Sequence, residues 1–251
     1  MNSIDIFSMT KTWAENQGLK IWAERETSST NTIAKEDHID QTIPVLALGA
    51  VTSAPSLYLT EKQTGGRGRG TNRWETPPTA ALLSSWSFAL AKAPQPVLSP
   101  QVGLALFEAA HATWPDLAFN LKAPNDLFIG PLKVAGLLIE TVEWGHARRC
   151  VVGLGLNVAS HPMQVATSTS LLEALGESSL PAERWHSFLT ALRAKLQSAM
   201  SEGQSPAISL SVRERLKEAL NRHPHFAEPI LEVDELGQLR MASQTILWHQ
   251  L

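Results

Sequence analysis

The stretch AFNLKAPNDLFIGPLKVAGLLIETVEW (residues 118–144) decides how the middle of this chain is predicted to fold. Its short apolar runs are interrupted by residues that favour turns, first Pro124-Asn125 and then Gly130-Pro131. We therefore predict a strand, a turn and then a pair of strands around Gly130-Pro131. The following stretch GHARRCVVGLGLNVAS (residues 145–160) predicts one more strand with a glycine-rich end.

The segments before this stretch also predict strands. GLKIWAERE (residues 18–26) alternates like a strand and leads into TSSTNTIAKE (residues 27–36), where Ser and Thr caps precede a short helical stretch. Further strands are expected at residues 43–50, 56–62 and 79–90, and the last is apolar enough to be buried on both faces. Only a short polar lead precedes residue 18, so neither a helix-turn-helix segment nor a repressor function is expected.

Helical patterns dominate the later part of the chain. Residues 100–114 have apolar side chains near helical spacing, and residues 168–200 show a helical pattern in which a long amphipathic helix starts on Pro181. Residues 201–209 have linker composition, residues 212–222 predict another helix, and the tail alternates around a turn at residues 235–237. We place one large domain at residues 1–203, followed by a linker helix and small β unit at residues 204–251.

Composition limits the class of protein. The 251 residues are 43% hydrophobic and 18% charged, as in a globular protein with a real core. A net charge of -3 disfavours a general nucleic-acid binder, so any anion site must be local. The single cysteine, the absence of a signal-peptide pattern and the absence of a long apolar run indicate a cytoplasmic, bacterial-type enzyme without membrane insertion.

The segment TEKQTGGRGRGTNRWET (residues 60–76) is the clearest candidate anion site. Its four glycines allow close backbone approach to a ligand, and Arg67, Arg69 and Arg73 can bind carboxylate or phosphate oxygens in bidentate fashion. The spacing differs from that of a Walker loop. A solvated flexible loop is the alternative, against which Trp74 offers an apolar anchor or a stacking face.

Three other motifs carry polar groups in apolar surroundings. Within residues 121–140, polar side chains interrupt strands that otherwise look buried, which is costly unless these side chains line a site; an ordinary turn is the alternative. In GLGLN (residues 153–157), Gly153 and Gly155 suggest close backbone approach, and an asparagine ends the motif. The motif SSTN (residues 28–31) offers hydroxyls and an amide, or acts as a helix cap only.

Taken in order, five motifs resemble those of the biotin protein ligases. They are STN (residues 29–31), QTGGRGR (residues 63–69) with Trp74, KAPND (residues 122–126), KVAGLLIE (residues 133–140) and GLGLN (residues 153–157). The resemblance covers residues 18–160, and loosely the tail after residue 228, and it is to monofunctional members without an N-terminal DNA-binding domain. It implies an α/β catalytic domain built on a mixed β-sheet with packed helices, plus a small, truncated SH3-like β unit.

The resemblance also implies an activity. Such enzymes make biotinyl-5′-AMP from biotin and ATP, release pyrophosphate, and transfer biotin to one lysine of the carrier domain of a biotin-dependent carboxylase of the acetyl-CoA carboxylase type. Mg²⁺ would arrive with ATP through phosphate oxygens and water, and no residue of the chain is predicted to bind a metal by itself. We expect no DNA or membrane partner, and a monomer or homodimer.

The motif positions imply site residues. Lys133 would bridge the biotin carboxylate and the α-phosphate, Arg67 and Arg69 would cover both anions, and Asp126 would orient the attacking lysine amine. The expected biotin contacts are Ser29, Thr30, Asn31, Gln63, Gly66, Arg67, Gly68, Arg69, Lys133 and Gly136. The expected ATP contacts are Trp74, Lys122, Asn125, Lys133 and Asn157.

The chain departs from the family pattern in three places. Ala123 stands where the family usually has tryptophan, and Gly70-Thr71-Asn72 replaces a more basic stretch, so weaker retention of the acyl-adenylate is expected. The tail ends at Leu251 without the family's final strand and its nearby arginine, so help for ATP from that part is not expected.

Several alternatives stay open at this stage. A lipoate or octanoate ligase or transferase shares the architecture, although its usual GG-x-x-x-H arrangement is not seen, and a non-catalytic homologue would only bind biotin or a carrier. An RNA-binding loop is disfavoured by the negative charge and by the 6% aromatic content. His223 and His225 lack a third metal ligand, and Cys150 has no neighbouring cue for a nucleophile.

Overall fold

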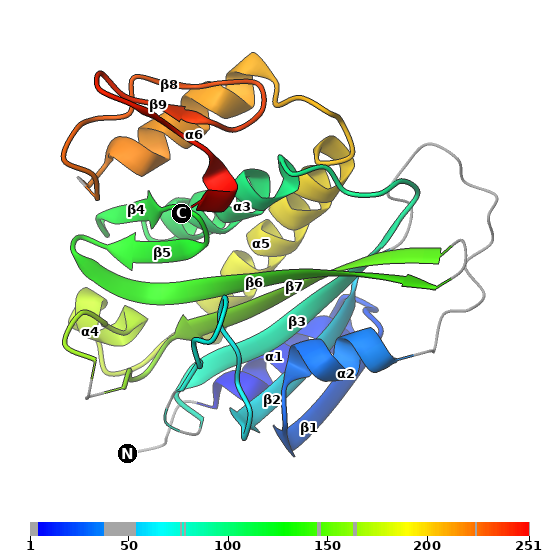
Figure 1. Cartoon of the computed structure of the whole chain (residues 1–251). Helices are drawn as coiled ribbons and strands as arrows, with labels where there is room; N and C mark the ends of the chain where they lie inside the picture. Colours follow the sequence, from blue (N-terminus) through cyan, green and yellow to red (C-terminus); the bar gives the residue numbers. More distant parts are fainter. Residues whose placement is uncertain are drawn as a thin grey trace.

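A seven-stranded mixed sheet forms the centre of the chain (Figure 1). The computed structural model describes residues 5–37, 54–75, 77, 79–144, 147–162, 165–223 and 225–250. The strands follow the spatial order β1-β2-β3-β7-β6-β5-β4. Their bounds are β1 Ile21–Thr27, β2 Ser56–Gln63, β3 Ala81–Leu90, β4 Phe119–Lys122, β5 Asp126–Ile129, β6 Leu132–Trp144 and β7 Ala147–Asn157. The strand expected at residues 43–50 lies outside the described residues.

The sheet is mixed because its first two strands are parallel and all other pairs are antiparallel. β1 and β2 run parallel, with helix α2 (Thr30–Glu36) in the connection between them. β3 pairs antiparallel with both β2 and β7, and nine of its ten residues are buried, as expected for a central strand. The quoted stretch at residues 118–144 forms β4, β5 and β6 as consecutive antiparallel strands. The predicted mixed α/β sheet is therefore confirmed.

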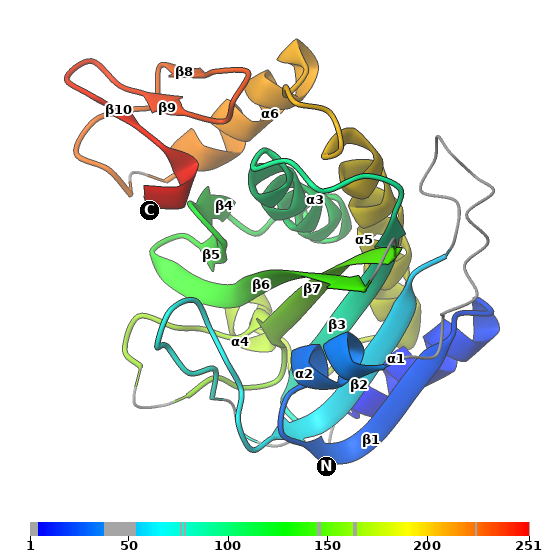
Figure 2. The same ribbon diagram turned by 45° about the vertical axis from the view of Figure 1, so that its right-hand side comes forward.

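Helices cover the two faces of the sheet unequally (Figure 2). Helices α1 (Ile6–Asn16), α3 (Leu98–Thr113) and α5 (Ala182–Glu202) pack on one face and share the main hydrophobic core with β3. On the other face, α2 packs by Ala34 against a small cluster that contains Tyr58 and Val151. Much of that second face is therefore left for other segments to line.

Helix α1 shows that the prediction of a short polar lead before residue 18 was wrong. Asp5 begins the helix by accepting a hydrogen bond from the Ser8 amide at 2.8 Å. Ile6 and Trp13 are buried, and the Trp13 indole Nε1 donates to Thr190 Oγ1 of α5 at 3.0 Å. The apolar residues lie together on one side of the helix. Along the sequence they are interspersed with polar residues that face water, so the segment looks polar when it is read linearly.

The helical pattern expected at residues 168–200 divides into two helices. Helix α4 spans only Leu171–Leu175 and ends at Gly176, whose φ of 66° breaks the helix. The expected long helix is confirmed as α5, which starts directly after Pro181. Ser168 is not helical, because the segment around it pairs with β6: Thr169 N donates to Lys133 O at 2.9 Å.

A small unit follows α5. Helix α6 (Leu210–Asn221) precedes a three-stranded antiparallel sheet of β8 (Glu232–Val233), β9 (Leu239–Arg240) and β10 (Thr245–Ile246), and a 3₁₀ turn spans Trp248–Gln250. The expected small C-terminal sheet is thus confirmed. The domain boundary at residue 203 stays a prediction.

None of the helices described combines the length and the apolarity needed to cross a bilayer. Nor do three or more His, Cys, Asp or Glu side chains gather into a metal-binding group within the described ranges.

The buried thiol of Cys150 gives a direct test of the core. Cys150 lies in β7 with no exposed surface, and burial raises the pKa of its thiol to about 12. We expect iodoacetamide at mildly alkaline pH to label Cys150 only when guanidinium chloride unfolds the chain, with a single mass increment because there is one cysteine. Rapid labelling of the protein in native buffer would contradict this placement.

Candidate active site

A hollow in the sheet begins where glycines replace side chains on one face of β6 and β7. Gly136 pairs with Gly155, and Leu138 pairs with Gly153, so the three glycines point to the same face. The intervening leucines of the GLGLN motif, such as Leu154, point to the opposite face and join the core. A Cβ atom on Gly153 would come 2.4 Å from Asn31 Oδ1, so only glycine permits this close approach.

The Gly-Arg segment forms a short hairpin over this hollow. Arg67 and Arg73 make an antiparallel bridge, and Gly68 N donates to Asn72 O at 2.8 Å. The tip turns at Gly70, whose φ of 61° suits glycine. The residues Gly70-Thr71-Asn72 thus build an ordered turn, and the loop is held by its own backbone.

Trp74 ends the hairpin and lies on the glycine floor. A Cβ atom on Gly155 would come 2.3 Å from Trp74 Cε2, and one on Gly136 would come 3.0 Å from Trp74 Cζ3. The Lys133 ammonium lies 5.6 Å from the centroid of the indole ring. The glycines and the tryptophan are therefore complementary in shape.

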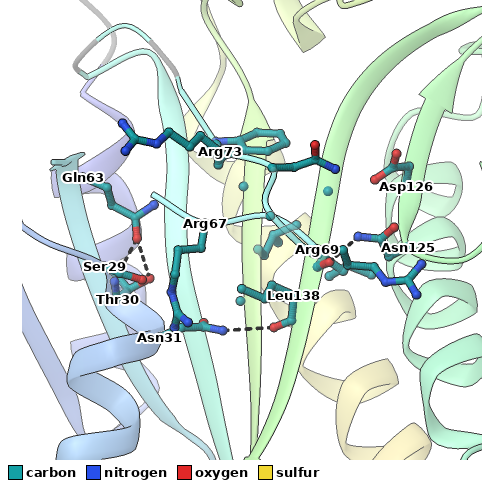
Figure 3. A pocket seen from close by; sticks show the side chains of 18 of the residues that line it. Ser29, Thr30, Asn31, Gln63, Arg67, Arg69, Arg73, Asn125, Asp126 and Leu138 are labelled. Atoms are coloured by element: carbon teal, nitrogen blue, oxygen red, sulfur yellow. Dashed lines mark hydrogen bonds between the residues drawn. The ribbon is translucent and has the colours of Figure 1, made fainter. Parts of the chain in front are cut away.

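Hydroxyl and amide groups line one end of the hollow. Thr30 N donates to Gln63 Oε1 at 2.8 Å, and the Ser85 hydroxyl lies 2.8 Å from Thr30 Oγ1. Asn31 donates from Nδ2 to Leu138 O at 3.1 Å. In Figure 3, Gln63, Ser29, Thr30 and Asn31 gather on one side of the cavity, with dashed lines marking their hydrogen bonds. This end is polar and largely buried.

The carboxylate of Glu140 holds the hairpin and α2 together. It accepts hydrogen bonds from Asn31 Nδ2 at 2.9 Å, Lys35 Nζ at 2.6 Å and Arg67 Nη2 at 2.9 Å. Burial acts to raise the pKa of Glu140, but the hydrogen bonds from Lys35 and Asn31 and the nearby charges outweigh it, so that the pKa lies below its ordinary value. Glu140 is therefore ionised at neutral pH and fixes Arg67 beside the hollow.

A lysine and a carboxylate line the opposite end. Lys133 Nζ lies 2.7 Å from Asp126 Oδ1. The preceding Asn125 is bonded twice to β6: its Nδ2 donates to Leu137 O at 2.6 Å, and its backbone oxygen accepts from Leu137 N at 2.9 Å. The turn that carries Asn125 and Asp126 is thereby fixed against the strand that carries Lys133.

These groups surround one cavity with about 670 Å³ of space, part of it open to solvent. Of the residues expected at the site, it is lined by Ser29, Thr30, Asn31, Gln63, Arg67, Gly68, Arg69, Trp74, Asn125, Asp126, Lys133 and Gly136. The further lining residues are Asn72, Arg73, Ser84, Leu137, Leu138, Gly153, Leu154 and Gly155, of which Leu137 and Leu154 also belong to the hydrophobic core. The sequence did indicate three of these residues. Gly153 and Gly155 alternate with leucine in GLGLN, and Arg73 is a charged residue of the Gly-Arg segment.

Three expected contacts lie outside the cavity wall. Gly66 is buried, and a Cβ atom there would come 2.3 Å from Trp74 O, so it serves the packing of the hairpin. Lys122 is exposed, with its Nζ 5.5 Å from the centroid of the Phe128 ring. Asn157 is buried and donates to Thr169 O at 3.1 Å.

The arrangement can hold an extended ligand with two different ends. The hydroxyl and amide end suits a neutral group with both donors and acceptors. The other end combines Lys133 with Arg69, which lies beside Asn125 in Figure 3, while Arg67 lies near Asn31. These cations suit carboxylate or phosphate groups and the charge that develops when two anions react. The arrangement can therefore accommodate a ligand that carries an acid group on one end and a neutral polar group on the other.

Comparison with known proteins identifies the class. Residues 23–157 match the model of the "Biotin/lipoate A/B protein ligase family", which is more than half of the chain. The chain belongs to this family.

Two similar relatives are ligases by name. The bifunctional ligase/repressor BirA of Escherichia coli K12 is 31% identical over 170 residues, which is 65% of this chain and 52% of the relative. The biotin--[acetyl-CoA-carboxylase] ligase of Mycobacterium tuberculosis is 32% identical over 123 residues, 47% of this chain and 45% of the relative. The chain spans about half the length of the curated relatives it matches.

A solved structure has the same fold. The biotin protein ligase from Aquifex aeolicus in complex with biotin and ATP superposes with a TM-score of 0.65 at 20% identity, over 90% of this chain and 94% of that one. At this identity the likeness concerns the fold, and it agrees with the mixed sheet described above.

The contact between Gly155 and Trp74 can be tested by adding one methyl group. Gly155→Ala would place a Cβ atom 2.3 Å from Trp74 Cε2, so we expect the indole to leave the glycine floor and become more exposed. Acrylamide quenching of tryptophan fluorescence measures this exposure when a parallel Trp74→Phe background is subtracted. Gly103→Ala is the matched control, because nothing lies within 4 Å of a Cβ atom there. Unchanged Trp74 quenching in Gly155→Ala would show that the ring lies elsewhere.

The charge of Glu140 can be tested by its pH dependence. Because the pKa of Glu140 is lowered on folding, its contribution to stability is present above the ordinary value of 4.5 and is lost as the pH falls through the lower folded value. Glu140→Gln should destabilise the protein by about 1–2 kcal/mol at neutral pH in urea unfolding, and by less in acid. The control Glu143→Gln, at an exposed pair with Arg148, should cost less than about 1 kcal/mol. A pH-independent difference between wild type and Glu140→Gln would refute the assignment.

Proposed function

We propose that this protein is an ATP-dependent biotin protein ligase, which activates biotin to biotinyl-5′-AMP and transfers biotin to a lysine of a biotin carrier domain. One observation carries the proposal: a single cavity joins the buried polar end at Thr30 and Gln63 to the cationic end at Lys133. Biotin has the same two ends, a ureido ring with donors and acceptors and a carboxylate on an apolar chain.

The polar end favours biotin over lipoate or octanoate. Ser29, Thr30 and Asn31 are each at least 96% buried, and their hydroxyl and amide groups need polar partners. An alkyl or dithiolane tail would bring no donor or acceptor to this end, whereas a ureido group could add hydrogen bonds to the polar groups that line it. The lipoate and octanoate activity is therefore the second candidate, and a purely binding role is the third.

In the first step, a biotin carboxylate oxygen attacks the α-phosphorus of ATP. A bond forms between that oxygen and phosphorus, the bond from phosphorus to the bridging oxygen breaks, and pyrophosphate leaves with its electron pair. Lys133 neutralises the two anions as they approach, and Arg67 and Arg69 lie beside the same cavity to cover them. Mg²⁺ fits as an ion held by phosphates and water, since Asp126 alone contributes a carboxylate among the described lining residues.

In the second step, the neutral ε-amine of the carrier lysine attacks the acyl carbon, and AMP leaves. Asp126 is the carboxylate in place to orient this amine or take its proton. The hairpin at residues 66–74 would keep water from the mixed anhydride meanwhile. The position of each group around one cavity supports these roles.

Only some of the residues expected to bind ATP line the cavity. Trp74 and Asn125 line the cavity and can flank a base or ribose. Lys122 and Asn157 do not line it, so the site gives no support for direct contact by either.

The setting of the reaction is part of the proposal. We assign catalysis to residues 1–203, with residues 204–251 as a separate small unit, and place the enzyme in the cytoplasm as a monomer or homodimer. The carrier would be that of a biotin-dependent carboxylase, and DNA is not assigned as a partner.

One assay separates the candidates. The protein is mixed with ATP, Mg²⁺ and a biotin carrier domain, together with biotin, lipoate or octanoate, and pyrophosphate and carrier mass are followed. We expect pyrophosphate and a carrier mass gain with biotin. A gain with lipoate or octanoate instead would establish the second candidate, and the absence of both signals with every acid would leave the binding role.

Replacement of Lys133 tests the mechanism. Lys133→Met keeps the length of the side chain and removes the charge, so the rate of pyrophosphate release should fall by about 100-fold or more. The control Lys62→Met makes the same chemical change on β2, where Lys62 forms an exposed ion pair with Glu26 of β1, and it should leave the rate unchanged. Full activity of Lys133→Met would rule out its role between the two anions.

A further inference from the structure

The 3₁₀ turn of the small C-terminal unit reaches the turn that carries two of the site residues. Trp248 is 7% exposed, and its indole Nε1 donates to Pro124 O at 3.1 Å. Figure 1 shows this 3₁₀ turn, in red, beside β4 and β5. Pro124 lies between Ala123 and Asn125 in the connection from β4 to β5. The contact therefore joins a segment near the end of the chain to the wall of the cavity.

We propose that Trp248 is a positioning residue, which holds the turn of residues 123–125 in the place where Asn125 and Asp126 serve the reaction. This proposal rests on the proposed function for its kinetic consequence. The physical claim, that the indole restrains the turn, stands on the contacts themselves.

The turn is held from two sides. On one side, Leu137 N donates to Asn125 O at 2.9 Å and Asn125 Nδ2 donates to Leu137 O at 2.6 Å, which ties the turn to β6. On the other side, the indole of Trp248 bonds to Pro124 O. Asp126 follows at once and pairs with Lys133 at 2.7 Å. A shift of the turn would therefore move both the amide and the carboxylate.

The indole and the turn are both buried. Ala123 and Trp248 are each 7% exposed, and both belong to the main hydrophobic core. Burial of the ring keeps water from competing for the Pro124 oxygen, which strengthens the hydrogen bond.

The unit that carries Trp248 is anchored elsewhere, so Trp248 is not on a loose tail. The His225 ring lies 2.5 Å from Asn120 Oδ1 of β4, which joins the unit to the central sheet. Within the unit, Asn221 of α6 exchanges two hydrogen bonds with Ile230, at 2.7 and 2.9 Å, and Ile208 N donates to Glu235 O at 2.7 Å. The hydrogen bond from Trp248 to Pro124 O therefore links this docked unit to the turn that forms part of the cavity wall.

The test compares two Trp→Phe variants that each lose one indole hydrogen bond. Trp248→Phe removes the donor to Pro124, and Trp13→Phe removes the donor to Thr190, between α1 and α5. Trp13 is 2% exposed, so both variants keep an aromatic ring in a buried place. Global loss of stability affects both variants, whereas loosening of the turn affects only one.

The first readout is amide hydrogen exchange, which does not depend on activity. The Leu137 amide is protected by Asn125 O, and the Trp114 amide, bonded to Ala110 O at 2.9 Å directly after the end of α3, is the internal reference. We expect exchange at Leu137, relative to Trp114, to speed up by about 10-fold in Trp248→Phe and to stay unchanged in Trp13→Phe. No change at Leu137, or an equal change in both variants, would overturn the proposal.

The second readout is the split between kcat and KM for biotin adenylation. We expect kcat to fall by about 10-fold in Trp248→Phe while KM for biotin stays constant, because the polar end of the cavity is untouched. A change in KM alone, or the same kcat in both variants, would overturn the positioning role. If the wild-type protein makes no biotinyl adenylate, the proposed function fails, and the exchange readout still decides whether Trp248 restrains the turn.

Discussion

The missing side chains of Gly136, Gly153 and Gly155 create the space around which the site is built. Successive side chains of a strand point to opposite faces of the sheet, so leucines of β6 and β7 enter the core while these glycines face the cavity. The same two strands therefore serve stability on one face and binding on the other. The glycine face admits Asn31 and Trp74 so closely that a single methyl group would clash with either. The positions of α2 and of the hairpin therefore both depend on the absence of these side chains.

Two carboxylates balance the cations around this space. Glu140 lies on the same face of β6 as Gly136 and holds Arg67, while Asp126 holds Lys133. In the free protein Arg67 and Lys133 each have a carboxylate partner already, so an anionic ligand that approaches either of them replaces or joins an existing ion pair. This arrangement limits nonspecific anion binding and favours ligands that satisfy both ends of the cavity at once.

The central strands and most of the cavity lining could be predicted from the sequence, because they depend on short local patterns. Turn-forming residues separate the strands of residues 118–144, and the alternating glycines of GLGLN indicate close backbone approach. Helix α1 was missed because its buried side chains are interspersed with polar ones. The distance of Lys122 from the cavity and the Trp248 contact with Pro124 depend on strand pairing and on segments more than 100 residues apart in the chain, which a linear pattern cannot show. The small Ala123 gave a signal by its departure from the family pattern, but only the fold shows that an indole lies near it.

The self-bonded hairpin over the cavity also bears on kinetics. A disordered loop must lose about 1–2 kcal/mol of backbone conformational entropy per residue when it closes on a ligand. Here the Gly68-to-Asn72 and Trp74-to-Gly66 backbone bonds order the segment before any ligand arrives, at 2.8 and 3.1 Å. A segment ordered in advance has little of this entropy left to lose, so its ordering would not slow the binding of a ligand beneath it.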